Sequence, residues 1–186
     1  MPYGIILLPD TRTSARLVAY ARSIARDVPT IMCVDEVRRP HLTLRHVDCD
    51  RAEAAELWGR TCATVPAELP VVLSGTQIAA FATGDPYVPQ GGVYVGSEAL
   101  RSADLDAAHR EVLRHARELS LGTLTSAGAD YRPHVTLAVL ETTDRVLVPV
   151  PPQELSVPFT GHLAWGAMGP YGTFPDIIEI RNAAAT

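Results

Sequence analysis

Short apolar runs alternate with amphipathic stretches along most of the chain. Apolar residues spaced by three and four positions predict helices, while short runs rich in β-branched residues predict strands. We expect helices at residues 13–27, 51–65 and 104–119. We expect strands at residues 3–8, 31–34, 41–47, 71–81, 93–95, 133–140, 156–165 and 176–181. Because the two kinds of element alternate irregularly, the pattern predicts an α+β fold.

A six-residue motif occurs twice within this pattern. Residues 39–44 are Arg-Pro-His-Leu-Thr-Leu, and residues 132–137 are Arg-Pro-His-Val-Thr-Leu. Five of the six positions are identical, and the two copies begin 93 residues apart, half the length of the 186-residue chain. One His-x-Thr sequence arises easily by chance, but two copies in the same setting do not. The repeat therefore indicates two related halves.

The spacing within each motif predicts one polar and one apolar face. Residues i and i+2 of a strand project from the same face, so His41 lies beside Thr43, and His134 beside Thr136. The leucine and valine residues between them point into a core. If a pseudo-twofold axis relates the halves, two imidazoles and two hydroxyls surround one small groove.

This set of groups suits acid–base chemistry at phosphorus. Histidine titrates near neutral pH, so one ring can act as general base and the other as general acid. The threonine hydroxyls can donate hydrogen bonds to the non-bridging phosphoryl oxygens. This scheme requires no metal, and we expect no cofactor. The three cysteines, Cys33, Cys49 and Cys62, form no CxxC pair, so neither a zinc site nor a disulfide framework is expected.

Composition and charge narrow the range of partners. The formal net charge is −5, and every basic residue other than histidine is an arginine. An acidic chain attracts long polyanions poorly, so extended nucleic-acid binding is not expected. A small phosphorylated substrate held by one or two arginines is compatible with this charge. We find no membrane span and no signal peptide, which favours a cytoplasmic protein. Nor is there a glycine-rich phosphate loop of the GxGxxG or GxxxxGK type.

The two motifs resemble those of the 2H phosphoesterase superfamily, and within it the bacterial 2′-5′ RNA ligase and cyclic phosphodiesterase branch. The order of elements before each motif fits this resemblance across nearly the whole chain. The resemblance implies a single bilobal domain over residues 1–186, with one motif per half and two antiparallel sheets lining a central groove with helices outside. It also implies hydrolysis of 2′,3′-cyclic phosphates or related phosphodiesters, or the reverse joining of RNA ends. Residues 182–186 are expected to form a frayed tail.

Further residues near the motifs are candidates for substrate binding. Arg45, Arg39 and Arg132 share strand parity with the motif histidines and can bind phosphate, although each also suits a solvent-facing strand end. Tyr131 can stack on a base, or can serve as a rim tyrosine. Tyr171 lies in a glycine-rich segment at residues 166–174 that either borders the groove or is simply a turn. By parity His46 should leave the groove, and His109, His115 and His162 are expected to be structural.

Two other functions fit the same motifs. The groove can bind a phosphorylated small molecule without turning it over, or it can catalyse a biosynthetic lyase or cyclase step. Retention of both histidines favours chemistry, because arginine serves simple anion binding better. A purely structural duplication is disfavoured, since buried and unpaired His/Thr faces are costly.

Overall fold

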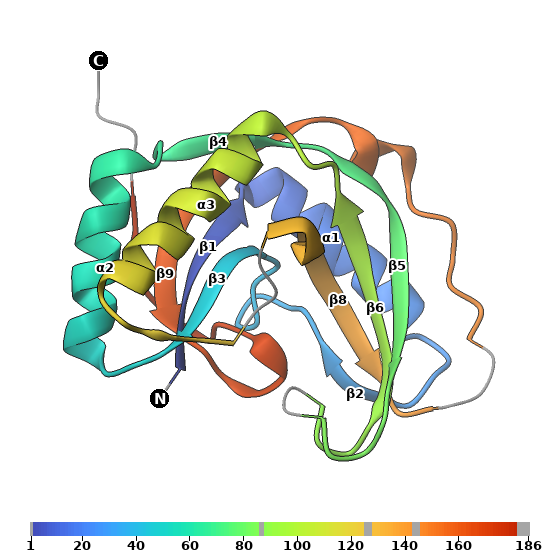
Figure 1. The fold of residues 1–186 in the computed structure, drawn as a ribbon. Coiled ribbons are helices and arrows are strands. Elements are labelled where there is room, and N and C mark those ends of the chain that lie inside the picture. The colour runs from blue at the N-terminus through green and yellow to red at the C-terminus, as the bar shows by residue number, and fades with distance from the viewer. Residues whose placement is uncertain (1, 86–87, 125–127, 143–145, 182–186) are drawn as a thin grey trace.

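Figure 1 shows a computed structural model of the chain, which describes residues 2–85, 88–124, 128–142 and 146–181. These residues form an α+β fold, as the sequence predicted. Three α-helices are present in them: α1 (Thr11–Ile24), α2 (Arg51–Thr64) and α3 (Ala103–Glu118). The strands are β1 (Pro2–Pro9), β2 (Thr30–Cys33), β3 (Leu42–Asp48), β4 (Glu68–Val71), β5 (Leu73–Phe81), β6 (Gly92–Ala99), β7 (Gly122–Thr123), β8 (His134–Leu140), β9 (Phe159–Ala167) and β10 (Asp176–Ile180). Three 3₁₀ turns complete the described elements: η1 (Gly128–Asp130), η2 (Gln153–Ser156) and η3 (Pro170–Gly172).

Local capping explains where the three helices begin. Asp10 accepts a hydrogen bond from the backbone of Thr13 at the start of α1. Asp50 caps α2, and Glu53 reaches back to the Asp50 backbone to complete a capping box. Ser102 caps α3 in the same manner. Such caps satisfy amides that the first helical turn leaves unpaired, so all three predicted helices are confirmed within a few residues.

The strands form one antiparallel, hydrogen-bonded sheet rather than two. Its main path is β10-β9-β1-β3-β8-β6-β5, with β2 on β8, β4 on β9 and β7 on β3. The halves of the sheet meet where β3 pairs with β8, and Leu42 and Val135 are the pair recorded there. The two predicted sheets are therefore joined into one where the strands of the two motifs pair.

The order of elements repeats along the chain. The series β1-α1-β2-β3 returns as β6-α3-β7-β8, and each series ends on a His-x-Thr motif. The halves exchange elements, because β2 pairs with β8 while β7 pairs with β3. Helix α1 likewise lies against β8, and α3 against β3 (Figure 1). Since Leu42 and Val135 are equivalent motif positions, their antiparallel pairing places an approximate twofold axis between them.

Long-range pairing accounts for the main departures from the predicted strands. The expected strand at residues 71–81 is wrong as one element, because the chain breaks at Val72: β4 joins β9 in one half, while β5 joins β6 in the other. The strand expected from residue 156 begins at residue 159, after η2. The predicted tail at 182–186 lies outside the described residues. In the part of the chain that is described, no helix has both the length and the apolar character needed to cross a membrane.

Candidate functional site

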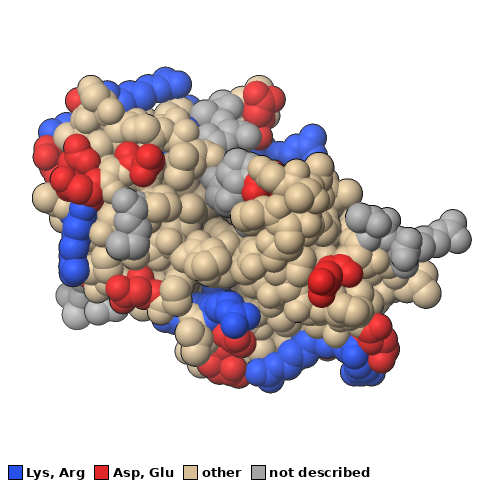
Figure 2. Space-filling model, turned by 90° about the horizontal axis from the view of Figure 1, so that it is seen from below, with Lys and Arg blue, Asp and Glu red and all other residues tan. Residues whose placement is uncertain are grey.

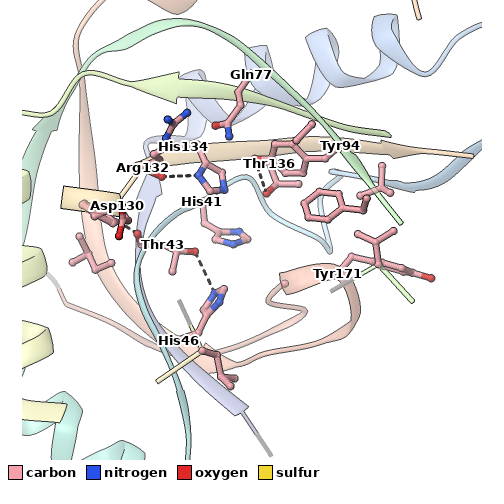
Figure 3. Close-up of a pocket in the computed structure, with 18 residues that line it drawn as sticks. His41, Thr43, His46, Gln77, Tyr94, Asp130, Arg132, His134, Thr136 and Tyr171 are labelled. Carbon is pink, nitrogen blue, oxygen red and sulfur yellow. Dashed lines mark hydrogen bonds between the residues drawn. The ribbon is translucent and has the colours of Figure 1, made fainter. Parts of the chain in front are cut away.

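The two motifs line one cavity at the junction of the sheet halves (Figure 3). Its volume is about 340 Å³, within the range of small-molecule sites. The motif leucines and valine are buried in the sheet, while the histidines and threonines lie on its open face. The described residues that line the cavity are His41, Thr43, Leu44, His46, Gln77, Ala79, Phe81, Val88, Tyr94, Leu124, Asp130, Tyr131, Arg132, His134, Thr136, Val139, Tyr171 and Gly172.

The two motif histidines are held in the same way. Nδ1 of His41 lies 2.9 Å from the carbonyl oxygen of Arg39, and Nδ1 of His134 lies 2.7 Å from that of Arg132. A carbonyl only accepts, so each Nδ1 carries a proton and donates it. In the neutral form of each ring Nε2 therefore carries no proton and is the nitrogen that can accept one. Figure 3 shows both rings turned toward the same space.

Each histidine lies across from the threonine of the other motif. The antiparallel pairing of Leu42 with Val135 places Thr43 opposite His134, and His41 opposite Thr136. Directly opposed side chains of an antiparallel pair share one face of the sheet. The four groups therefore surround one small volume, as the motif spacing predicted.

A β-bulge follows each threonine. Leu44 is skipped in the pairing of β3 with β1, and Leu137 is skipped in the pairing of β8 with β6. The two leucines occupy the same position of the motif, directly after Thr43 and Thr136. An extra residue reverses the alternation of faces beyond it. The bulge is thus a second repeated feature of the two halves.

The bulges overturn two predictions made from strand parity. Arg45 was expected to share the face of His41, but its side chain is 2% exposed and it is not among the described residues that line the cavity. His46 was expected to leave the groove, but it lines the cavity. The second motif behaves identically, because Ala138 is buried and Val139 faces the cavity. Arg45 therefore lies on the core side of β3.

The threonine hydroxyls each have a polar neighbour beside the cavity. Oγ1 of Thr43 lies 3.2 Å from Nε2 of His46. Oγ1 of Thr136 lies 3.4 Å from the Tyr94 hydroxyl. An aromatic ring also stands edge-on to each motif histidine: Phe174 at 4.8 Å from His41 and Tyr94 at 5.5 Å from His134, between ring centroids. These contacts fix the orientation of the four motif side chains.

Burial lowers the pKa of all three cavity histidines. The pKa of His41 falls to about 4, because burial and the nearby His134 outweigh the carbonyls of Arg39 and Gly172. The pKa of His46 falls to about 3, again mainly through burial. Burial also lowers the pKa of His134, but the carbonyl of Arg132 and the charge of Glu98 oppose it. His41 and His46 are thus neutral at pH 7.

The depressed pKa values predict that acid destabilises the fold. The unfolded chain takes up protons on His41 and His46 below about pH 6.5, whereas the folded chain does so only near pH 4 and 3. The unfolding free energy should therefore fall as the pH drops from about 6.5 to 5, by about 1.4 kcal/mol per pH unit for each histidine. Chemical denaturation across this range measures the slope. His46→Phe should lower the slope by the share of one histidine, and a wild-type slope near zero would contradict the burial of these rings.

The remaining predicted residues divide between the cavity and its support. Arg132 is exposed and lines the cavity, whereas Arg39 is partly exposed, does not line it, and contributes its backbone carbonyl. Tyr171 borders the cavity, and its hydroxyl accepts a hydrogen bond from Gln90 at 2.9 Å. The glycine-rich segment around Tyr171 is therefore both a turn and a wall of the cavity.

Tyr131 supports the first motif from below. Its ring is 5% exposed and stacks on His109 with centroids 3.7 Å apart, so that face is not open to a base. Its hydroxyl donates to the carbonyl of Thr43 at 3.0 Å, and Nδ1 of His109 lies 2.8 Å from the carbonyl of Leu44. Tyr131 and His109 therefore hold consecutive carbonyls at the bulge, where the regular ladder is interrupted.

Sequence reasoning missed several cavity residues. Gln77, Ala79 and Phe81 alternate along β5, and Tyr94 lies on the neighbouring β6. Their alternation was visible, but the side of the groove they face follows from long-range strand pairing. No motif marks Asp130, which lies in η1. Among the described residues, no cluster of three or more His, Cys, Asp or Glu side chains is arranged to hold a metal ion.

Comparison with solved structures places this geometry in a known fold. LigT of E. coli in complex with 3′-AMP matches with a TM-score of 0.66 and 13% identity, covering 100% of both chains. TT0787 of Thermus thermophilus matches with a TM-score of 0.66 and 19% identity, over 97% of this chain and 96% of that one. A phosphoesterase matches with a TM-score of 0.60 and 13% identity, over 96% and 95%. No protein-family model and no curated protein matches the sequence. At these identities the matches show the fold, and the fold implied by the sequence resemblance is confirmed.

Proposed function

We propose that the chain is a phosphoesterase of the two-histidine kind that hydrolyses a cyclic phosphodiester, of the 2′,3′-cyclic nucleotide or RNA-end type. The observation that carries this proposal is the matched pair of imidazoles. Each has Nδ1 tied to a carbonyl two residues upstream, so that both Nε2 atoms face one cavity. A binding site for an anion has no need of two such rings, whereas displacement at phosphorus needs a base and an acid on opposite sides.

The different environments of the rings favour one assignment of their roles. The pKa of His41 near 4 makes it the neutral ring, so it accepts the proton of a water molecule that attacks phosphorus. Burial lowers the pKa of His134, but the carbonyl of Arg132 and the charge of Glu98 favour its protonated form, so His134 donates its proton to the ester oxygen as the P–O bond breaks. The product is a phosphomonoester. Thr43 and Thr136 donate to the non-bridging oxygens, and Arg132 at the rim attracts the anion.

The surroundings of the cavity favour a small substrate over a long nucleic acid. Arg132 and Asp130 are the fully charged side chains among the described residues that line it, and their charges cancel. On the face drawn in Figure 2, arginines and acidic side chains are interspersed around a largely uncharged centre. Structures of LigT in complex with 3′-AMP, ATP and phosphate show that this fold can hold small phosphorylated ligands.

The proposed roles predict an acidic pH optimum. Because kcat/KM reports the ionisation of free enzyme, its acid limb should lie near the His41 pKa of about 4 and its basic limb below 6.5, the ordinary value from which the pKa of His134 is lowered. A bound phosphate anion favours the protonated ring, so the basic limb of kcat should lie at higher pH than that of kcat/KM. Steady-state kinetics between about pH 3.5 and 8 measure both limbs. An optimum of kcat/KM above pH 8 would contradict these roles.

A substrate screen tests the function itself. Purified protein is incubated with the four 2′,3′-cyclic nucleotides and a short 2′-5′-linked oligonucleotide, with and without EDTA, and the products are identified by chromatography. The expected result is hydrolysis to nucleoside monophosphates at a rate that EDTA does not change. A His41/His134 double variant should show no hydrolysis. Loss of turnover in EDTA would overturn the metal-independent scheme, and a ligand that is bound but recovered unchanged would favour a binding role.

A further inference from the structure

The groove between the two halves is sealed on one side. Ile6 and Leu8 of β1, Ala164 of β9 and Phe174 form a separate apolar cluster, and each is at most 2% exposed. These side chains lie on the opposite face of β1 from Ile5 and Leu7, which belong to the main core. Phe174 approaches this closely because Gly4 has no side chain: a Cβ atom there would lie 2.3 Å from the Phe174 ring.

The equivalent surface of the other half is open. On β5, Gln77, Ala79 and Phe81 occupy alternate positions, are partly exposed, and line the cavity. Gln77 pairs with Gly96, which in turn pairs with Thr136, so the three residues lie in a row across the sheet. Gly96 has no side chain of its own, and the ring and hydroxyl of Tyr94 occupy the space above it. The described cavity lining includes no residue of β1, β9 or β10.

The open side differs in character along its length. At the motif end, Gln77 lines the cavity and supplies an uncharged side-chain amide. Such an amide can form a hydrogen bond with a polar group of a ligand. Farther along, Ala79, Phe81, Val88 and Val139 make the wall apolar. A flat, uncharged ring fits this wall better than a second phosphate.

We propose that the organic part of the substrate binds on the β5–β6 side of the groove, and that this subsite selects a mononucleoside phosphate. In this arrangement the phosphate lies between the histidines, a polar group of the nucleoside forms a hydrogen bond with the Gln77 amide, and the base lies against Ala79 and Phe81. The ester oxygen then faces His134, and water enters from the His41 side. This rests on the proposed function for its chemistry, but binding alone tests it.

Two substitutions on adjacent residues of β5 provide the test. Ala79→Leu fills the subsite, whereas Ala80→Leu adds the same side chain at an exposed position that does not line the cavity. The probes are adenosine 2′-monophosphate and inorganic phosphate, measured by isothermal titration calorimetry. Ala79→Leu should raise the Kd of adenosine 2′-monophosphate at least about tenfold and leave that of phosphate within twofold, and Ala80→Leu should change neither.

The outcomes separate the subsite from the catalytic proposal. Nucleotide binding that Ala79→Leu leaves unchanged, or that is undetectable in the wild type, would overturn the subsite. Equal loss of nucleotide and phosphate binding in Ala79→Leu would also overturn it, because the substitution would then act on the phosphate position. Turnover of ethylene glycol cyclic phosphate, which has no base, should persist in Ala79→Leu. Absence of turnover in the wild type, with the predicted binding pattern intact, would overturn the phosphoesterase function and leave the subsite standing.

Discussion

Replacing either His41 or His134 with asparagine is expected to lower kcat/KM for a 2′,3′-cyclic nucleotide by about 10²- to 10⁴-fold. Asparagine retains a donor near the position of Nδ1, so the hydrogen bond to the carbonyl of Arg39 or Arg132 can persist. It has no atom at the position of Nε2, so proton transfer is lost. Because the two rings act on one transition state, kcat/KM of the double variant should be only slightly lower than that of the less active single variant.

His162, a histidine outside the cavity, provides the control for this experiment. His162 lies on β9 beside Glu68 and does not line the cavity among the described residues. His162→Asn should therefore keep wild-type kcat/KM. Circular dichroism and thermal unfolding verify that each variant folds. A folded His41→Asn or His134→Asn variant with activity within threefold of wild type would remove that ring from the mechanism.

Replacing Phe174 with alanine should reduce the unfolding free energy by about 3–5 kcal/mol, as expected for a large buried ring. The same change exposes the edge of His41, since the two rings are in edge-to-face contact at 4.8 Å. Burial is the main cause of the lowered His41 pKa, so that pKa should rise toward 6.5. The acid limb of kcat/KM should move to higher pH with it. Denaturant unfolding and the pH profile measure the two effects.

A phenylalanine of the main core separates lost stability from altered chemistry. Phe159 belongs to the main core cluster and makes no recorded ring contact with a histidine in the described structure. Phe159→Ala should lower stability without moving the acid limb. If the alanine variant does not fold, Phe174→Leu, which keeps most of the buried apolar area, replaces it in the measurement of the acid limb. An acid limb that stays in place in a folded Phe174 variant would contradict the role of this ring in burying His41.

The sequence predicted the core of the candidate site because the motif repeats over a short distance. His41 and Thr43 are two residues apart, and strand geometry alone places them on one face. It did not predict that His46 enters the cavity while Arg45 leaves it. The bulge after Thr43 depends on the register between β3 and β1, and on tertiary hydrogen bonds from Tyr131 and His109. Strand parity is unreliable past such a point.

The fold, too, was predictable from the sequence only in part. Helices were predictable from apolar periodicity and from local caps such as Asp50, whose capping box lies within four consecutive residues. The break at Val72 was not predictable, since it marks where the chain passes from one half of the sheet to the other. Nor does any local pattern show that Phe174 seals one half of the groove, because that contact joins distant segments through Gly4.

Both imidazoles are expected to present Nε2 to one shared cavity. Long-range ¹H–¹⁵N NMR of the histidine side chains, with and without adenosine 2′-monophosphate, measures this directly. We expect His41 to be the neutral, Nδ1-protonated tautomer at pH 7, and the Nε2 resonances of both His41 and His134 to shift on addition of the ligand. An Nε2-protonated tautomer at His41, or a ligand that shifts one ring and leaves the other unchanged, would contradict the account.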